Sequence, residues 1–112
     1  MSSGRNEEIR RRIEEIGEEE GAIRSSFELL EEHEQQIKTD VKKTLRFLDE
    51  SRGWKGDQAD RFHAGIEGVL LDNASEARHA IDQTRDQLQD RLRWLENERQ
   101  QLNAEQKTAE EK

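Results

Sequence analysis

The 112-residue sequence contains no cysteine and no proline, and these two absences limit both its chemistry and its fold. Without cysteine the chain can form no disulfide, no thiolate zinc site and no cysteine nucleophile. Without proline, nothing in the chain forces a helix to stop or kink. Tyrosine is absent as well, and the aromatic residues are three phenylalanines and two tryptophans. The sequence therefore favours long uninterrupted helices and has few large side chains with which to build a core.

Hydrophobic residues are also scarce, at 29% of the chain against 41% charged residues. This composition fits either a thin helical core or disorder, so the spacing of the apolar residues has to distinguish them. No apolar run is long enough for a membrane span, and the first residues lack the apolar segment of a secretory signal, so we expect cytoplasmic synthesis. The net charge of −8 argues against a nucleic-acid partner, because phosphate binding requires clustered basic residues.

The first half of the chain has apolar residues spaced three and four apart, which is a heptad pattern. Position a of the heptad falls on Ile13, Glu20, Phe27, Glu34, Val41 and Leu48, and position d falls on Ile9, Ile16, Ile23, Leu30, Ile37 and Thr44. Leu29 and Leu45 lie beside this seam and widen the apolar face beyond what one partner helix covers. The pattern predicts a helix over about 6–51. Gly17 and Gly21 each weaken it by roughly 1 kcal/mol relative to alanine, so its first twenty residues can fray or hinge.

The second half shows an eleven-residue repeat, with apolar steps of mostly four, four and three. Its stripe consists of Ala59, Phe62, Ile66, Leu70, Asn73, Ala77, Ile81, Thr84, Leu88, Leu92, Leu95 and Leu102. The pattern predicts a turn at 52–57, a helix over about 58–102 and a disordered tail at 103–112. We therefore expect an all-α fold with one domain, residues 1–104. In it, two long antiparallel helices form a coiled-coil-like hairpin that pairs further into a four-helix bundle.

A W-x-G-x-x-A-x-x-F run lies between the two predicted helices and is formed by Trp54, Gly56, Ala59 and Phe62. Trp54 can close the end of the hairpin, and Gly56 lets the backbone turn sharply. Ala59 permits close approach of the helices, and Phe62 is expected to face the same stripe one turn later. We interpret the four residues as a hairpin-turn motif. The alternative is that the tryptophan only caps a hairpin in an unrelated coiled coil.

This motif, placed centrally in a short helical chain, resembles the WXG family of small helical hairpins associated with type VII secretion. The long charged first helix and the W-x-G-x-x-A-x-x-F run are most similar to the YwqH-like partner proteins of LXG polymorphic toxins. The resemblance implies a partner, chaperone or targeting factor that binds the helical N-terminal region of an LXG-type toxin, or a sister hairpin, before export. It leaves open whether the chain is exported with its partner. Many WXG-type pairs carry a Y-x-x-x-D/E export signal, and this chain has no tyrosine.

The apolar face is one stripe deep, which predicts that the hairpin binds another protein or a second copy of itself. The residues expected to form this partner interface are Ile23, Phe27, Leu30, Ile37, Val41, Ile66, Leu70, Ile81, Leu88, Trp94 and Leu95. Trp94 lies off the main stripe near Arg91, and both residue types are favoured at binding hot spots. Alternatively, Trp94 covers the open end of the hairpin. The alternative function is a structural coiled-coil homodimer or spacer.

The sequence offers no arrangement that indicates catalysis. Glu76 and His79 have the E-x-x-H spacing of di-iron bundles, but Ala77 and Ile81 define the buried stripe there and turn His79 toward solvent. We therefore expect no enzymatic activity and no cofactor, metal or small-molecule substrate. Four polar residues within the stripes either set the pairing register or stay partly exposed: Glu20, Glu34, Asn73 and Thr84.

Overall fold

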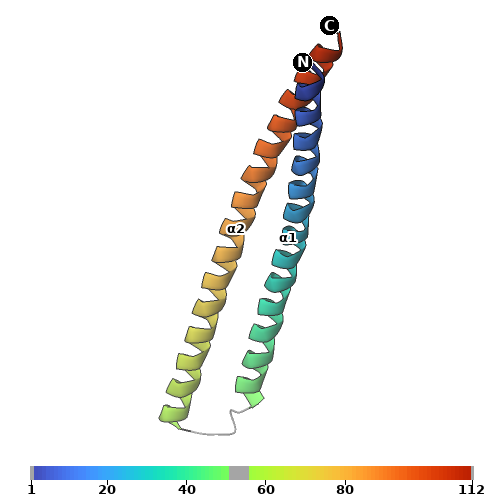
Figure 1. Cartoon of the computed structure of the whole chain (residues 1–112). Coiled ribbons are helices and arrows are strands. Elements are labelled where there is room, and N and C mark those ends of the chain that lie inside the picture. Colours follow the sequence, from blue (N-terminus) through green and yellow to red (C-terminus); the bar gives the residue numbers. More distant parts are fainter. Residues whose placement is uncertain (1, 51–55, 112) are drawn as a thin grey trace. The chain divides into compact units, whose positions relative to one another are not determined.

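The structure is a computed structural model that describes residues 2–50 and 56–111, and it contains two helices (Figure 1). Helix α1 spans Ser2–Glu50 and helix α2 spans Asp57–Glu111. No strand occurs in the stretches that the structure describes. The predicted all-α helical hairpin is therefore confirmed.

The chain divides into two compact units, each built from one segment of each helix. The terminal unit comprises residues 1–28 and 85–112, and the middle unit comprises residues 29–84. Within each unit the segment of α1 runs antiparallel to the segment of α2 (Figure 1).

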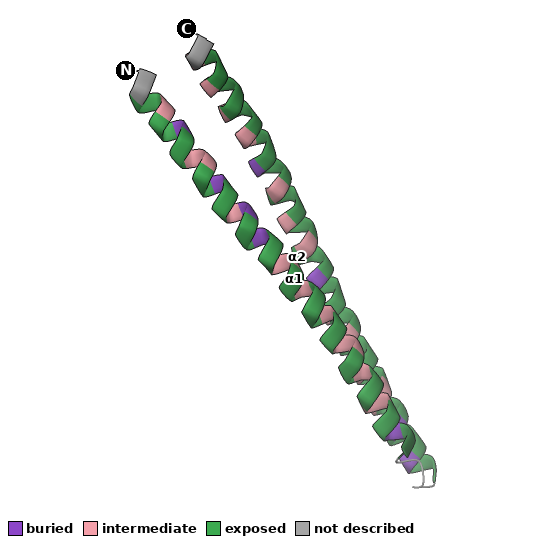
Figure 2. Ribbon diagram, turned by 90° about the vertical axis from the view of Figure 1, so that its right-hand side faces the viewer, coloured by how far each residue is buried: buried purple, intermediate pink, exposed green. Residues whose placement is uncertain are grey.

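The seam of α1 follows the predicted heptad. Every a and d position from Ile9 to Leu48 is buried or half-buried, and these positions lie along one side of the helix (Figure 2). The helix continues through Gly17 and Gly21 without interruption. Seam residues Ile16 and Glu20 are buried beside the two glycines, so packing offsets the weak helix propensity.

The seam of α2 differs from the prediction at three places. Its seam positions from Ala59 to Leu88 are all buried or half-buried and are spaced four, three and four apart: Ala59, His63, Ile66, Leu70, Ala74, Ala77, Ile81, Arg85 and Leu88. The predicted seam residues Phe62, Asn73 and Thr84 are exposed, and the next residue along the chain takes each place. The eleven-residue period is correct, but its middle position was assigned to the more apolar Phe62 instead of His63. Beyond Leu88 the spacing becomes a heptad through Leu92, Leu95, Arg99, Leu102, Gln106 and Ala109.

The predicted outer boundaries of the helices are wrong. Helix α1 begins at Ser2 instead of about residue 6, and α2 continues to Glu111 instead of ending near 102. Residues 103–111 of the predicted disordered tail are helical, and the seam continues there through half-buried Gln106 and Ala109. The Arg5 guanidinium also pairs with the Glu105 carboxylate at 2.9 Å and so joins the first turns of α1 to the last turns of α2. Most of the predicted turn lies outside the described residues.

A cluster of buried apolar side chains lies in the terminal unit. Ile16, Ile23 and Leu95 are buried together, and the half-buried side chains packed against them are Phe27, Leu88, Leu92 and Leu102. Burial of an aliphatic side chain contributes roughly 1.5–3 kcal/mol, so this cluster is the main apolar contribution to pairing in that unit.

Candidate interaction surfaces

The structure describes three residues of the hairpin-turn motif, of which Ala59 is buried and Gly56 and Phe62 are exposed. Gly56 has a φ of 131°, in the left-handed region that favours glycine, and its carbonyl accepts a hydrogen bond from the Asp60 N–H at 3.1 Å. Ala59 is 2% exposed. Phe62 is 55% exposed, so the prediction that it faces the seam is wrong. Trp54 lies outside the described residues.

His63 occupies the seam position predicted for Phe62, and its residue type gives no apolar signal for that position. Its ring is buried, and Nδ1–H donates a hydrogen bond to the Ala59 carbonyl at 2.8 Å. The exposed Phe62 ring lies edge-on to the imidazole at 6.0 Å. A local hydrogen bond within one helical turn satisfies the polar nitrogen, which is why a histidine fits this seam position. The observed spacing of four, three and four residues, counted from Ala59, leads to His63, Ile66 and Leu70.

The predicted interface residues of the terminal unit are mostly used within the hairpin. Ile23 and Leu95 are buried in its core, and Phe27 and Leu88 pack against that core. Trp94 is 51% exposed and lies outside it. The guanidinium carbon of Arg91 stacks over the Trp94 ring at 4.3 Å from its centroid, so the indole is held on the surface by a cation–π contact.

The predicted interface residues of the middle unit are less enclosed. Ile81 is buried there, and five others are half-buried: Leu30, Ile37, Val41, Ile66 and Leu70. This unit also carries most of the exposed large apolar side chains, namely Leu29, Phe47, Phe62, Val69 and Leu71. The two units therefore present different surfaces, and the middle unit leaves more apolar area in contact with water.

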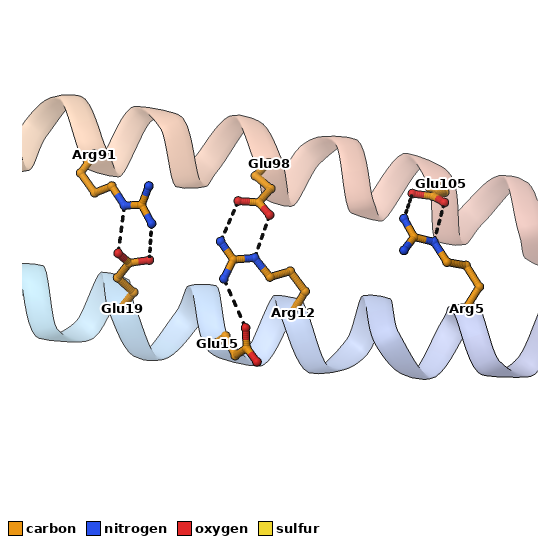
Figure 3. Close-up of polar contacts among 7 residues, drawn as sticks. All are labelled: Arg5, Arg12, Glu15, Glu19, Arg91, Glu98 and Glu105. Atoms are coloured by element: carbon orange, nitrogen blue, oxygen red, sulfur yellow. Dashed lines mark hydrogen bonds and ion pairs between the residues drawn. The ribbon is translucent and has the colours of Figure 1, made fainter.

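Three ion pairs, repeated at intervals of seven residues, join the helices of the terminal unit (Figure 3). In each, both oxygens of one carboxylate accept hydrogen bonds from one guanidinium, at 2.7–3.1 Å: Arg5 with Glu105, Arg12 with Glu98, and Arg91 with Glu19. We call these pairs the ion-pair ladder. Paired fork geometry of this kind is the strong form of the arginine–carboxylate contact.

The order of charges in the ladder permits one register only. Along α1 it runs positive, positive, negative, and the facing residues of α2 are negative, negative, positive. A slip of one heptad would bring Arg12 opposite Arg91 in one direction, or Glu19 opposite Glu98 in the other. Like charges facing each other across two helices destabilise pairing, so the ladder favours the observed alignment of the terminal unit.

Two pairs of the ladder, Arg5 with Glu105 and Arg12 with Glu98, also shift the pKa values of their members. The hydrogen bond from Arg5 lowers the pKa of Glu105, and the hydrogen bond from Arg12 lowers the pKa of Glu98. The same hydrogen bonds raise the pKa of each arginine. The ionised pairs are therefore favoured at neutral pH.

One further ion pair lies within the seam of the terminal unit. Glu20 is buried and pairs with Arg99, which also contacts Glu96 at 3.1 Å. Of the two alternatives given for Glu20, partial exposure is therefore excluded. Glu34 is half-buried and pairs with Lys38 at 3.7 Å.

The middle unit contains a groove of about 480 Å³ between the two helices. Ten residues line it: Ile37, Lys38, Val41, Lys42, Leu71, Ala74, Ser75, Arg78, His79 and Asp82. We call it the basic groove. It lies where the α2 seam has Ala74 and Ala77, whereas the terminal unit has leucines. The small side chains leave the space between the helices unfilled.

Within residues 2–50 and 56–111, no three histidine or acidic side chains are close enough together to hold a metal ion. His79 of the E-x-x-H spacing is exposed at the rim of the basic groove. Neither described helix is long and apolar enough to cross a bilayer.

The fold and these surfaces define an all-helical hairpin with coiled-coil-like pairing. Comparison of the chain with models of protein families, with curated proteins and with solved structures finds no significant match.

Proposed function

We propose that this hairpin is a non-enzymatic partner protein, a chaperone or targeting factor, of a type VII secretion system. In this proposal it binds the helical N-terminal region of an LXG-type toxin, or a sister hairpin, and accompanies that partner to export. The observation that carries the proposal is the W-x-G-x-x-A-x-x-F run at the junction of two long helices. Gly56 has the left-handed φ that a turn uses, and Ala59 of the run is buried.

The two units differ in how far their apolar seams are covered, and this difference supports a binding role. The terminal unit closes its apolar seam with its own core and ladder. The middle unit keeps half-buried seam residues and exposed apolar side chains such as Val69 and Leu71. Additional helices packed against this unit would remove that area from water, as in a four-helix bundle.

Co-expression tests the proposal. The chain would be produced with the helical N-terminal region of an LXG-type toxin encoded beside it, and with an unrelated helical coiled coil as the control. We expect a stoichiometric complex with the toxin region only, measured by affinity purification and native mass spectrometry. Failure to co-purify with the toxin region or with any neighbouring small hairpin would contradict the proposal.

A structural homodimer or spacer is the second candidate, and the core of the terminal unit favours a structural role because no toxin helix is needed to cover it. That core shows that much of the seam is already covered by the chain itself. Sedimentation of the purified chain distinguishes the two functions. A tight homodimer that excludes the toxin region supports the spacer, and exchange into a mixed complex supports the partner protein.

A further inference from the structure

The basic groove of the middle unit combines an apolar floor with cationic walls. Ile37 and Val41 of α1 face Leu71 and Ala74 of α2 across the groove. Leu71 remains 46% exposed, so the floor is not covered by the chain's own side chains. An apolar surface of this kind between two helices gains free energy when another apolar side chain covers it.

Positive charge on the walls comes from both helices. Lys38 and Lys42 line the α1 side, and Arg78 lines the α2 side, with His79 at the rim. Asp82 is the single acidic residue of the lining. The groove is therefore cationic within a chain whose net charge is −8.

Two of these cations differ from the arginines of the terminal unit. The terminal unit pairs Arg5, Arg12 and Arg91 with carboxylates across the helices. Lys42 and Arg78 have no acidic partner among the described residues, although they lie on opposite walls of one groove. They are available to carboxylates from outside the chain.

We propose that the basic groove binds an acidic amphipathic helix of a partner protein. The apolar side of that helix covers Val41 and Leu71, and its flanking carboxylates pair with Lys42 and Arg78. Amphipathic helices bind in grooves between two helices through apolar residues three and four positions apart. The α2 side of the basic groove extends from Leu71 to Asp82, which is long enough to contact such a helix over several of these residues.

The inference rests on the proposed function as a helical partner protein and names the surface and the chemistry of that partner. Binding is measured by fluorescence anisotropy with the full chain and a labelled synthetic helix that has leucine at heptad positions and glutamate elsewhere. A second peptide has lysine in place of every glutamate. The groove variant is Lys42→Glu with Arg78→Glu, and the matched control is Lys43→Glu with Arg61→Glu. Both variants change the net charge equally at exposed positions, and Lys43 and Arg61 lie outside the groove.

We expect the glutamate peptide to bind the wild-type chain and the control alike, and to bind the groove variant roughly tenfold or more weakly. The lysine peptide should not bind. Ser75→Phe fills the groove without altering charge and should weaken binding as well, while circular dichroism reports that each variant keeps its helices. Equal binding by the groove variant and the control would overturn the inference. Laurate, a small anionic amphiphile, is tested as well. Binding of laurate without binding of the glutamate peptide would also overturn the inference.

The co-expression experiment separates this failure from failure of the proposed function. If the toxin region co-purifies equally with wild type and with the groove variant, the function stands and the groove assignment is overturned. If the glutamate peptide binds through the groove but no toxin region or sister hairpin co-purifies, the groove assignment stands and the secretion function is overturned.

Discussion

Removal of the Glu20–Arg99 pair tests how a charged pair within the seam affects the stability of the hairpin. The side chain of Glu20 is 7% exposed and that of Arg99 is 28% exposed. Arg99→Leu leaves a buried carboxylate without a described partner and should lower the free energy of unfolding by about 3 kcal/mol. Glu20→Leu leaves an arginine that keeps Glu96 and reaches solvent, so its cost should be about 1 kcal/mol.

The double variant should behave differently from both single variants. Two leucines at these seam positions bury apolar area and remove the desolvation cost of both charges, so stability should equal or exceed that of wild type. Urea denaturation followed by circular dichroism gives the free energies. Arg93→Leu serves as the control, because the side chain of Arg93 is 77% exposed. The reasoning is refuted if Glu20→Leu costs more than Arg99→Leu, or if the double variant is less stable than both.

Three other changes probe the core, the ladder and the turn. Leu95→Ala should lower the free energy of unfolding by about 2–5 kcal/mol, whereas exposed Leu71→Ala should change it by less than about 1 kcal/mol, both measured in urea. The lowered pKa of Glu98 and of Glu105 means that the ladder stabilises the chain above the ordinary value of 4.5 and loses this contribution as pH falls through the lowered values. The stability gap between wild type and Glu98→Gln with Glu105→Gln should therefore close on acidification, and a gap that widens would contradict this. Ala59→Leu should destabilise by about 1–3 kcal/mol through overpacking, and an unchanged melting temperature would show that the position is not enclosed.

The seam of α1 could be predicted from sequence because its apolar residues dominate the heptad. Even Glu20 and Glu34 were placed correctly, since the surrounding spacing leaves no other choice. In α2 the prediction that Phe62 occupies the seam is wrong, because Phe62 is the more apolar residue but His63 fits the observed spacing. The imidazole of His63 hydrogen-bonds within its own helical turn, and a single-residue apolar pattern does not indicate this.

The ladder and the basic groove could not be predicted from one helix at a time. Pairing of Arg12 with Glu98 requires the alignment of α1 with α2, and charged residues are too frequent in this sequence to single out three pairs. The groove depends on small Ala74 facing Val41 across the middle unit, which is also a property of alignment. The extent of α2 beyond residue 102 was missed because half-buried Gln106 carries no apolar signal.

The pairing of α1 with α2 inside one chain underlies every proposal above, and distances between spin labels test it directly. The chain has no cysteine, so Glu8→Cys can be labelled together with Gln101→Cys or with Gln87→Cys. Gln101 lies near the level of Glu8 in the ladder's register, and Gln87 lies two heptads, about 21 Å, further along the helix axis. We predict the shorter distance for the Gln101 pair, unchanged when labelled chains are diluted with unlabelled ones. A shorter distance for the Gln87 pair, or a signal lost on dilution, would contradict pairing within the chain.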